Sequence, residues 1–204
     1  THIALSQQGN SPHDVLRVSA TITFGRIHVA PLLPPLLAAH PQLVCELILT
    51  DQLVDLVEDQ IDLALRMTRN PPQDAVARRI AAIERGLFAA PAYLAAHGTP
   101  ASVHELAQHQ SLSYLLTEGD RWRLQDAAGA EHVLPTTSRL RLNSTDALLD
   151  AALAGLGLAI LPAYLAASHV AAGRLRAVLP ALQPITPHGN AIYACYTPSR
   201  VRSP

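Results

Sequence analysis

Residues 77–100 read ARRIAAIERGLFAAPAYLAAHGTP and hold the pattern that decides the fold. Short apolar runs in the first half suit extended strands, and we expect strands over residues 76–83 and 86–90. Pro91 then opens the segment PAYLAAH at a helix position that tolerates proline. Extended segments that pass directly into a helix favour an α/β protein.

The preceding residues 16–41, LRVSATITFGRIHVAPLLPPLLAAHP, predict a strand over 16–20 and a helix that runs to about residue 39. Prolines at 31, 34 and 35 fall inside the helical pattern, so we expect a kink or two helical pieces. The next strand, 43–49, is nearly all apolar, as parallel strands covered on both faces tend to be.

A short helix over 53–59 and a strand over 62–67 complete a βαβαβ order, the signature of a doubly wound sheet. The later residues repeat the alternation. We expect helices over 91–97, 104–109, 145–154 and 163–172, and strands over 111–116, 121–126, 131–134, 139–142, 158–161, 175–178 and 191–196. The repeated pattern predicts two lobes, with the chain crossing near residues 89–91 and returning near 185–192.

Composition limits the possible functions. The 204 residues are 49% hydrophobic, which supplies core for one large domain or two small lobes. All 15 basic residues are arginine, and they are balanced by 16 acidic residues, so the chain alone is poorly suited to neutralising many phosphates of DNA. Cys45 and Cys195 each lie in an apolar run, and we expect reduced, buried thiols.

Targeting signals are not evident in the sequence. We find no apolar stretch of the roughly 18 residues that a membrane span needs, and no charged leader before an apolar segment. We therefore expect a cytoplasmic protein without membrane contact, although a signal peptide removed earlier is left open.

From residue 16 to residue 199 the order of motifs resembles the effector-binding domain of LysR-type bacterial transcriptional regulators, and the two quoted stretches carry the resemblance. It implies an α/β fold of two Rossmann-like lobes with a hinge, similar to type 2 periplasmic binding proteins. We expect a linker over residues 1–15. Lobe I would take residues 16–90 and 185–204, and lobe II residues 91–184.

The resemblance also implies a function. Such a domain binds a small-molecule effector between its lobes, here expected to be an acidic or aromatic metabolite, without a cofactor or catalysis. It assembles as a homodimer or tetramer, which sets residues 26–45 of one subunit against residues 164–178 of the other. DNA would be read only by the winged helix-turn-helix that precedes this domain in the family. The family usually adds a helix after the last strand, and we expect that helix to have been cut off or left out here.

Strand-to-helix turns at residues 19–24 and 143–146 are the expected ligand contacts, because helix starts present N–H groups that favour an anion. The alternative is that Thr23, Asn143 and Ser144 only cap their helices, although capping and ligand contact are compatible. Asp146 argues mildly against a strongly anionic ligand. Candidate effector-binding residues are Ser19, Thr21, Thr23, Phe24, Thr50, Arg66, Tyr114, Asn143, Ser144 and Thr145.

Arg66 ends the strand DLALRM, where the resembled family commonly carries a basic residue near the ligand. It can pair with an acidic effector, and a structural ion pair with Asp62 or Glu58 is the alternative. Phe24, Thr50 and Tyr114 could stack on or bond to a small ring, with core packing as the alternative for Tyr114.

Patterns typical of other classes are weak. The histidines form no HxH or HxxxH pair, so we expect no metal site. Gly155-Leu156-Gly157 follows a helix and precedes a strand, the reverse of a dinucleotide-binding loop, and is expected to end that helix. No GxSxG elbow is present. A secreted solute-binding protein of the same fold and an enzyme on a two-lobed scaffold remain the alternative functions.

Overall fold

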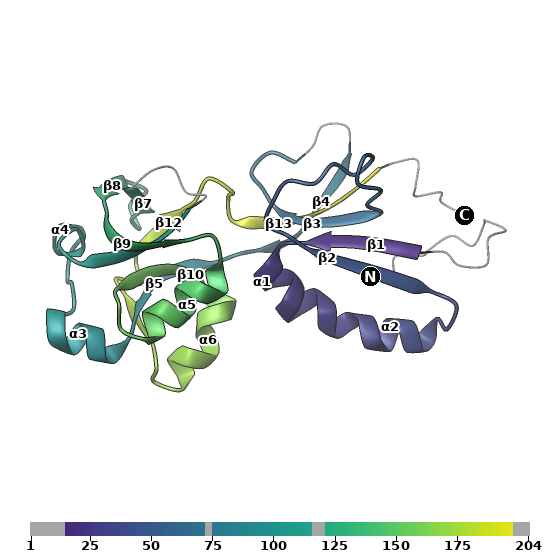
Figure 1. The fold of residues 1–204 in the computed structure, drawn as a ribbon. Helices are drawn as coiled ribbons and strands as arrows, with labels where there is room; N and C mark the ends of the chain where they lie inside the picture. The colour runs from purple at the N-terminus through teal and green to yellow at the C-terminus, as the bar shows by residue number, and fades with distance from the viewer. Residues whose placement is uncertain (1–14, 72–74, 116–120, 198–204) are drawn as a thin grey trace. The chain divides into compact units, whose positions relative to one another are not determined.

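The computed structural model describes residues 15–71, 75–115 and 121–197. The chain divides into two compact units (Figure 1). The first unit takes residues up to 82 together with residues from 191 onward, and the second takes residues 83–190. The expected linker over 1–15 and the end of the strand predicted to reach residue 116 fall largely or wholly outside the described residues.

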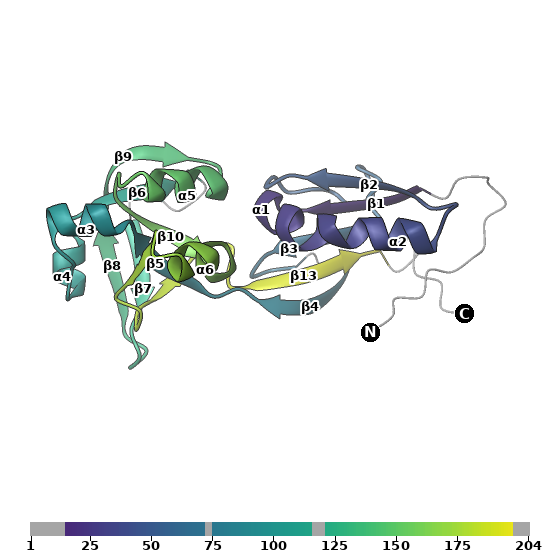
Figure 2. The same cartoon turned by 90° about the horizontal axis from the view of Figure 1, so that it is seen from below.

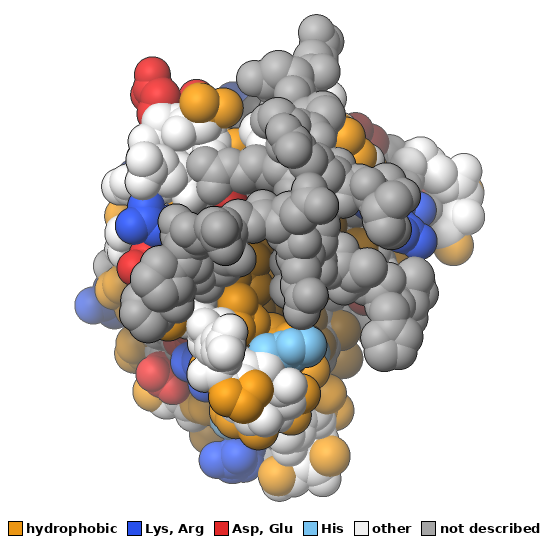
Figure 3. Space-filling view, turned by 90° about the vertical axis from the view of Figure 1, so that its right-hand side faces the viewer, with side chains coloured by type: hydrophobic (Ala, Val, Ile, Leu, Met, Phe, Trp, Pro, Cys, Tyr) orange, Lys and Arg blue, Asp and Glu red, His pale blue; other side chains and the backbone are white. Residues whose placement is uncertain are grey.

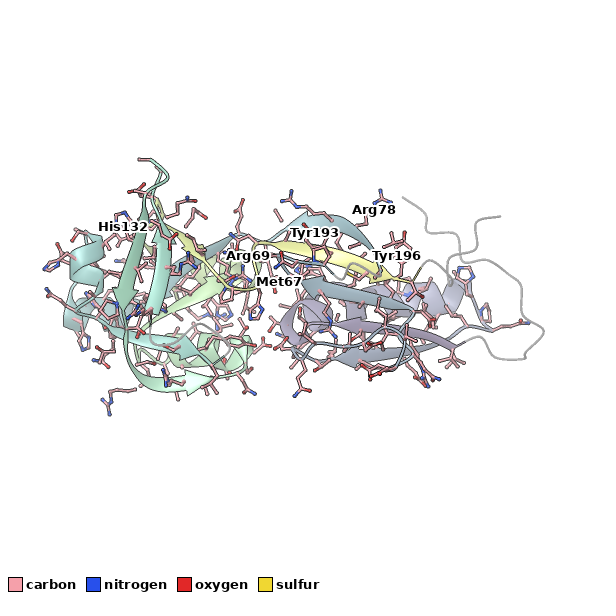
Figure 4. The ribbon with its side chains drawn as sticks, turned by 90° about the horizontal axis from the view of Figure 1, so that it is seen from above. Met67, Arg69, Arg78, His132, Tyr193 and Tyr196 are labelled. Carbon is pink, nitrogen blue, oxygen red and sulfur yellow. The ribbon has the colours of Figure 1, made fainter. Side chains whose placement is uncertain are left out.

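The first unit is built on one sheet with the strand order β2-β1-β3-β13-β4. Its strands are β1 (Val15–Ala20), β2 (Val44–Leu49), β3 (Leu63–Met67), β4 (Val76–Ala82) and β13 (Ala191–Tyr196). β1 pairs in parallel with β2 and β3, whereas β13 lies antiparallel between β3 and β4. Tyr193 and Tyr196 mark β13 in Figure 4, with Arg78 on β4. The carboxyl ends of β1, β2 and β3 therefore meet at one edge of this sheet.

A continuous helical run follows β1 and lies along one face of the sheet (Figure 2). It consists of α1 (Ile22–Phe24), a π-helical turn (Gly25–Val29), a 3₁₀ turn (Ala30–Leu32) and α2 (Leu33–Ala39). The expected interruption of the helix, given as a kink or two helical pieces, takes the form of these changes of helix type, because proline removes a backbone donor and disturbs the regular ladder. Val29 packs on Val18 and Ala20 of β1.

The helical run corrects the expectation that no apolar stretch reaches the length of a membrane span. Residues Ile22–Ala39 are long and apolar enough, at a mean hydropathy of 1.3, to match a membrane span by length and composition. Only 17% of that stretch is buried within the chain. The run also covers a sheet through Val29, so length and composition alone do not make it a span.

Two further expectations for the first unit are wrong. β2 is an edge strand whose residues alternate between half-buried and exposed, so it is not covered on both faces. Residues 56–60 form turns rather than the helix predicted over 53–59. The Asp55 carboxylate accepts the N–H groups of Val57 and Glu58 at 2.8 and 2.9 Å, a local bond that competes with a helix.

The second unit contains a five-stranded sheet, β11-β5-β10-β6-β9, and a three-stranded sheet, β12-β7-β8. The helices are α3 (Pro91–His97), α4 (Val103–Leu106), α5 (Thr145–Leu153) and α6 (Ala163–Ala171). The strands are β5 (Arg85–Ala89), β6 (Gln110–Tyr114), β7 (Arg121–Gln125), β8 (Glu131–Pro135), β9 (Thr137–Leu142), β10 (Leu158–Pro162), β11 (Arg176–Val178) and β12 (Gln183–Ile185). The short β12 has no counterpart in the prediction.

β5 pairs with β10 and β11, so it belongs to the second unit, whereas the sequence placed it in the first lobe. The core of this unit gathers Leu87, Tyr93, Trp122, Leu124 and Leu158.

On β8, His132, labelled in Figure 4, lies 2.8 Å from the Asp126 carboxylate. The returning segment is tied to β5, because the Arg85 guanidinium donates to the Gly189 carbonyl at 2.9 Å.

Gly155 ends the α5 segment with a φ of 76°, which confirms the reading of the glycine pair as a helix stop. Gly157 approaches the backbone of β6 so closely that a Cβ there would lie 2.6 Å from the Gln110 carbonyl oxygen. Both glycines therefore have structural reasons to be present.

Candidate functional site

In the first unit, the turn at residues 19–24 joins β1 to the helical run. Ser19 has no exposed surface, and its hydroxyl donates to the Ile48 carbonyl at 3.3 Å. Thr21 is the N-cap residue in an extended conformation and makes no side-chain cap bond. Thr23 lies inside α1 and is only 6% exposed. Phe24 is half-buried with its ring centroid 4.9 Å from that of His28.

The start of α1 is capped by a distant carboxylate. The Ile22 N–H donates to Asp51 Oδ1 at 3.0 Å, across 29 positions of sequence. The Thr50 N–H donates to the Ala20 carbonyl at 3.0 Å, which fixes the end of β2 beside the end of β1. The reading of Thr23 as the cap is therefore wrong, and Asp51 is a site residue that the sequence reasoning missed.

Arg66 connects the carboxyl ends of three strands. Its guanidinium donates to the Ser19 hydroxyl and to the Thr50 carbonyl. Its Nε is buried and has no hydrogen-bond partner among the described residues. Burial lowers the pKa of Arg66, while the nearby Asp51 carboxylate and Cys195 act in the opposite direction. The structure thus brings together Ser19, Thr50 and Arg66 from the predicted set.

The ion-pair alternative for Arg66 is not what holds this side chain. The Asp62 carboxylate accepts the Arg17 N–H at 2.8 Å. Among the described residues, Arg66 forms no ion pair with Asp62 or Glu58. Arg66 is held instead by one hydroxyl and one carbonyl.

In the second unit, Ser144 caps α5. Its hydroxyl accepts the Ala147 N–H at 3.3 Å, so the capping prediction is confirmed for this residue. Thr145 is the first residue of the helix and is half-buried, while Asn143 is exposed. Tyr114 is half-buried at the end of β6, which pairs there with Leu142 of β9. Residues 114 and 143–145 thus form a second strand-end group, in a unit of its own.

The chemistry available at these turns is polar and donor-rich. Among the described residues, no group of three or more histidine, cysteine or acidic side chains is placed to hold a metal ion. Cys45 and Cys195 are free thiols; Cys195 is buried, as expected, whereas Cys45 is only half-buried, and burial is the main cause that raises the pKa of each. Hydroxyl groups and one part-buried guanidinium are therefore the polar side-chain groups at these turns.

Comparison with known proteins places the chain. The family model described as the LysR substrate binding domain matches residues 9–204. The HTH-type transcriptional regulator DmlR of Escherichia coli is 32% identical over 180 residues, which are 86% of this chain and 58% of that protein. The HTH-type transcriptional activator TtdR of Escherichia coli is 31% identical over 180 residues, 86% of this chain and 57% of TtdR. The chain therefore spans less than two thirds of these relatives.

Solved structures agree on the fold. CrgA, a LysR-type transcriptional regulator from Neisseria meningitidis, is 27% identical with a TM-score of 0.79, covering 93% of this chain and 63% of that one. Full-length AphB, a virulence activator from Vibrio cholerae, is 24% identical with a TM-score of 0.80, covering 92% of this chain and 63% of AphB. The predicted α/β fold of the type 2 periplasmic-binding-protein kind is confirmed. The chain belongs to the LysR substrate-binding domain family.

Proposed function

We propose that this chain is the effector-sensing and dimerising domain of a LysR-type DNA-binding regulator. It binds a small acidic or aromatic metabolite at its strand-end turns and releases it unchanged. The observation that carries the proposal is Arg66, a part-buried guanidinium held by the carboxyl ends of adjoining strands. Ligands of open α/β sheets bind beyond those ends.

The roles of the whole protein follow the family. DNA is read by a winged helix-turn-helix outside residues 1–204, and the regulator works in the cytoplasm. The relatives are named as transcriptional regulators, which supports sensing over catalysis and over nutrient capture. Binding shifts the arrangement of the regulator only as far as the effector's affinities for its states differ.

The effector site is tested with two threonines that their helices do not use as caps. Thr21 and Thr145 make no side-chain cap bond, so replacing both with valine removes hydroxyls without removing a helix cap. We expect the unfolding temperature of the wild type to rise by about 5 to 10 °C with an effector at about a hundred times its dissociation constant. The compounds to be tested as effectors are carboxylates, aromatic acids, amino acids and neutral analogues.

The Thr21→Val, Thr145→Val variant should unfold near the wild-type temperature without ligand and lose most of the shift. Thr99→Val, at an exposed position outside both turns, is the matched control and should keep the shift. A full shift of the unfolding temperature in the double variant would show that the effector does not bind at these turns.

The dimer is proposed from the exposed apolar side chains of residues 26–45. α2 has no buried residue within the chain, and Leu32 and Val44 are 64% and 43% exposed. Val170, in the partner segment 164–178, is 39% exposed. Hydrophobic side chains reach the surface of the molecule in the space-filling view (Figure 3). Apolar surface of this kind suits an isologous interface.

Sedimentation equilibrium of the Leu32→Glu variant tests this interface. The wild-type chain should be dimeric at micromolar concentration, and the variant monomeric, because a charge in an apolar interface is not compensated. Leu53→Glu alters an even more exposed leucine, at 98%, outside both segments and should stay dimeric. A dimer that tolerates Leu32→Glu refutes this choice of surface.

A further inference from the structure

The chain passes between its two units at two places, which are joined to each other within the second unit. The first unit ends at Ala82 and resumes at Ala191, so the second unit begins with an entering segment, residues 83–85, and ends with a returning segment, residues 186–190. The Ile83 N–H donates to the Asn190 carbonyl at 2.8 Å, and Ile83 is only 5% exposed. The two segments therefore lie side by side where they leave the second unit.

Arg85 holds the returning segment through its guanidinium. Nη1 donates to the Gly189 carbonyl at 2.9 Å and to Asn190 Oδ1 at 2.8 Å. The Gly189 carbonyl also accepts the Thr186 hydroxyl at 3.2 Å, and the Gly189 N–H donates to the Thr186 carbonyl at 3.0 Å. Arg85 thus binds a closed turn whose backbone is already constrained.

The entering segment also holds the start of α6. β5 and β10 pair antiparallel, with Arg85 opposite Pro162. Next to this pair, the Ala163 N–H donates to the Glu84 carbonyl at 2.9 Å. Ala163 is the first residue of α6, which runs into the segment 164–178 proposed for the dimer. The entering segment therefore contacts both the returning segment and the first turn of α6.

The contact of Arg85 with the returning segment is made by a charged donor. Burial lowers the pKa of Arg85 to about 10, while Tyr164 acts in the opposite direction, so the guanidinium stays positively charged at neutral pH. A hydrogen bond from a charged donor is about twice as strong as one between neutral groups. The returning segment is therefore held more firmly than an uncharged side chain would hold it.

We propose that Arg85 is a positioning residue that couples the returning segment to the start of α6. The inference rests on the proposed effector function, in which α6 belongs to the dimer surface. A displacement of Gly189 and Asn190 moves the guanidinium, and the backbone of residues 84 and 85 carries the movement to Ala163. The two connections between the units and the dimer surface therefore respond together when the effector binds.

Residue-resolved amide hydrogen exchange of the whole chain, without ligand, tests the coupling. In Arg85→Met, we expect the Ile83 amide to exchange about tenfold faster, because the returning segment is released. The Ala163 amide should also exchange faster, by a smaller factor, because its acceptor lies one residue before the altered side chain. The Phe88 amide, in the middle of β5, should exchange at the wild-type rate.

Three further variants show whether the effect passes through Arg85. Arg85→Lys keeps the charge but not the fork of donors, so it should restore part of the protection, and it carries the test if Arg85→Met folds poorly. Thr186→Val removes a neutral donor from the same Gly189 carbonyl, and should speed exchange at Gly189 but not at Ala163. Arg121→Met, at an exposed arginine of β7, is the matched control and should behave as the wild type.

Two results would overturn the coupling. The first is an Ala163 amide that exchanges at the wild-type rate in Arg85→Met. The second is faster exchange throughout the second unit, Phe88 included, because it assigns Arg85 a general stabilising role. Neither result touches the effector function, which fails separately if no tested compound raises the unfolding temperature.

Discussion

The two strand-end turns solve the same problem in different ways. In the second unit, the hydroxyl of Ser144 caps α5 from a position three residues before its donor, Ala147. In the first unit, Asp51 caps α1 from the end of β2, across 29 positions. The cap in the second unit is local, whereas the cap in the first unit needs neighbouring strands to be in register. A remote cap therefore makes the first turn depend on the sheet around it.

The glycines of the two units extend this contrast and give the largest expected effect. A Cβ on Gly157 would lie 2.6 Å from the Gln110 carbonyl oxygen, part of a backbone that cannot yield cheaply. A Cβ on Gly25 would lie 2.3 Å from Leu49 Cδ2, which can move, and 2.9 Å from the Ala20 Cβ. We expect Gly157→Ala to cost about 3 kcal/mol of unfolding free energy, and Gly25→Ala less. Urea denaturation measures both, and a larger loss for Gly25→Ala would contradict the contrast.

Arg66 gives the next effect, because its loss removes the contact that joins three strand ends. Arg66→Met removes the guanidinium that donates to the Thr50 carbonyl and to the buried Ser19 hydroxyl. We expect a loss of about 1 to 3 kcal/mol, the usual cost of an unsatisfied buried group. Arg69→Met, at a nearby exposed arginine, is the control (Figure 4). Chemical denaturation that separates neither variant from the wild type would show that Arg66 has no structural role.

The caps can be compared directly. Asp51→Ala and Ser144→Ala should each lower the unfolding free energy by about 1 kcal/mol. Hydrogen exchange then separates them. Loss of the remote cap should speed exchange at Ile22 and at the neighbouring end of β2, whereas loss of Ser144 should act mainly in the first turn of α5. Equal spreading of faster exchange in the two variants would break the distinction between remote and local caps.

The smallest effect concerns pH and is confined to the second unit. Tyr93, which accepts the Gln110 N–H at 3.0 Å, lies 3.1 Å from His109 Nδ1. Burial, and then the charge of His97, lower the pKa of His109, while Glu105 opposes them. A histidine with a lowered folded pKa stabilises the fold fully above its ordinary value of 6.5, and that stability is lost as pH falls through the folded value.

We therefore expect the wild type to lose unfolding free energy between pH 7 and pH 5 through this residue. His109→Gln should flatten that part of the pH profile. His40→Gln, at an exposed histidine of the first unit, should leave it unchanged. Unfolding free energies that fall equally in all three proteins would assign the effect to other groups.

Elements with strong local signals were predictable from the sequence. α3 spans Pro91–His97 and β13 spans Ala191–Tyr196, as expected, because proline and an apolar run mark their limits. Ser144 was predictable as a cap, since it directly precedes its helix.

One local turn, and the features that depend on distant residues, were not predictable. The segment at 53–59 has helical composition, yet Asp55 closes a turn there and Gln60 adopts a φ of 56°. β12 exists only because Gln183–Ile185 pair with β7. Asp51 carries no cap signature, because its partner lies on another element. Ser19, Thr50 and Arg66 were named as candidates, but their mutual contact follows only from the sheet register.

The π-helical turn at Gly25–Val29 lets the first helical run hold one more residue than a regular helix would. A π turn accommodates one more residue than an α turn, so it is equivalent to a single-residue insertion. In a regular α-helix such an insertion would rotate everything beyond it by about 100° around the helix axis, whereas the π turn absorbs it. Deleting one residue there would restore an α turn, and Leu32 and the leucines of α2 that follow it would keep their direction. Two homologues that differ by one residue across this turn would therefore present the same apolar surface to their surroundings.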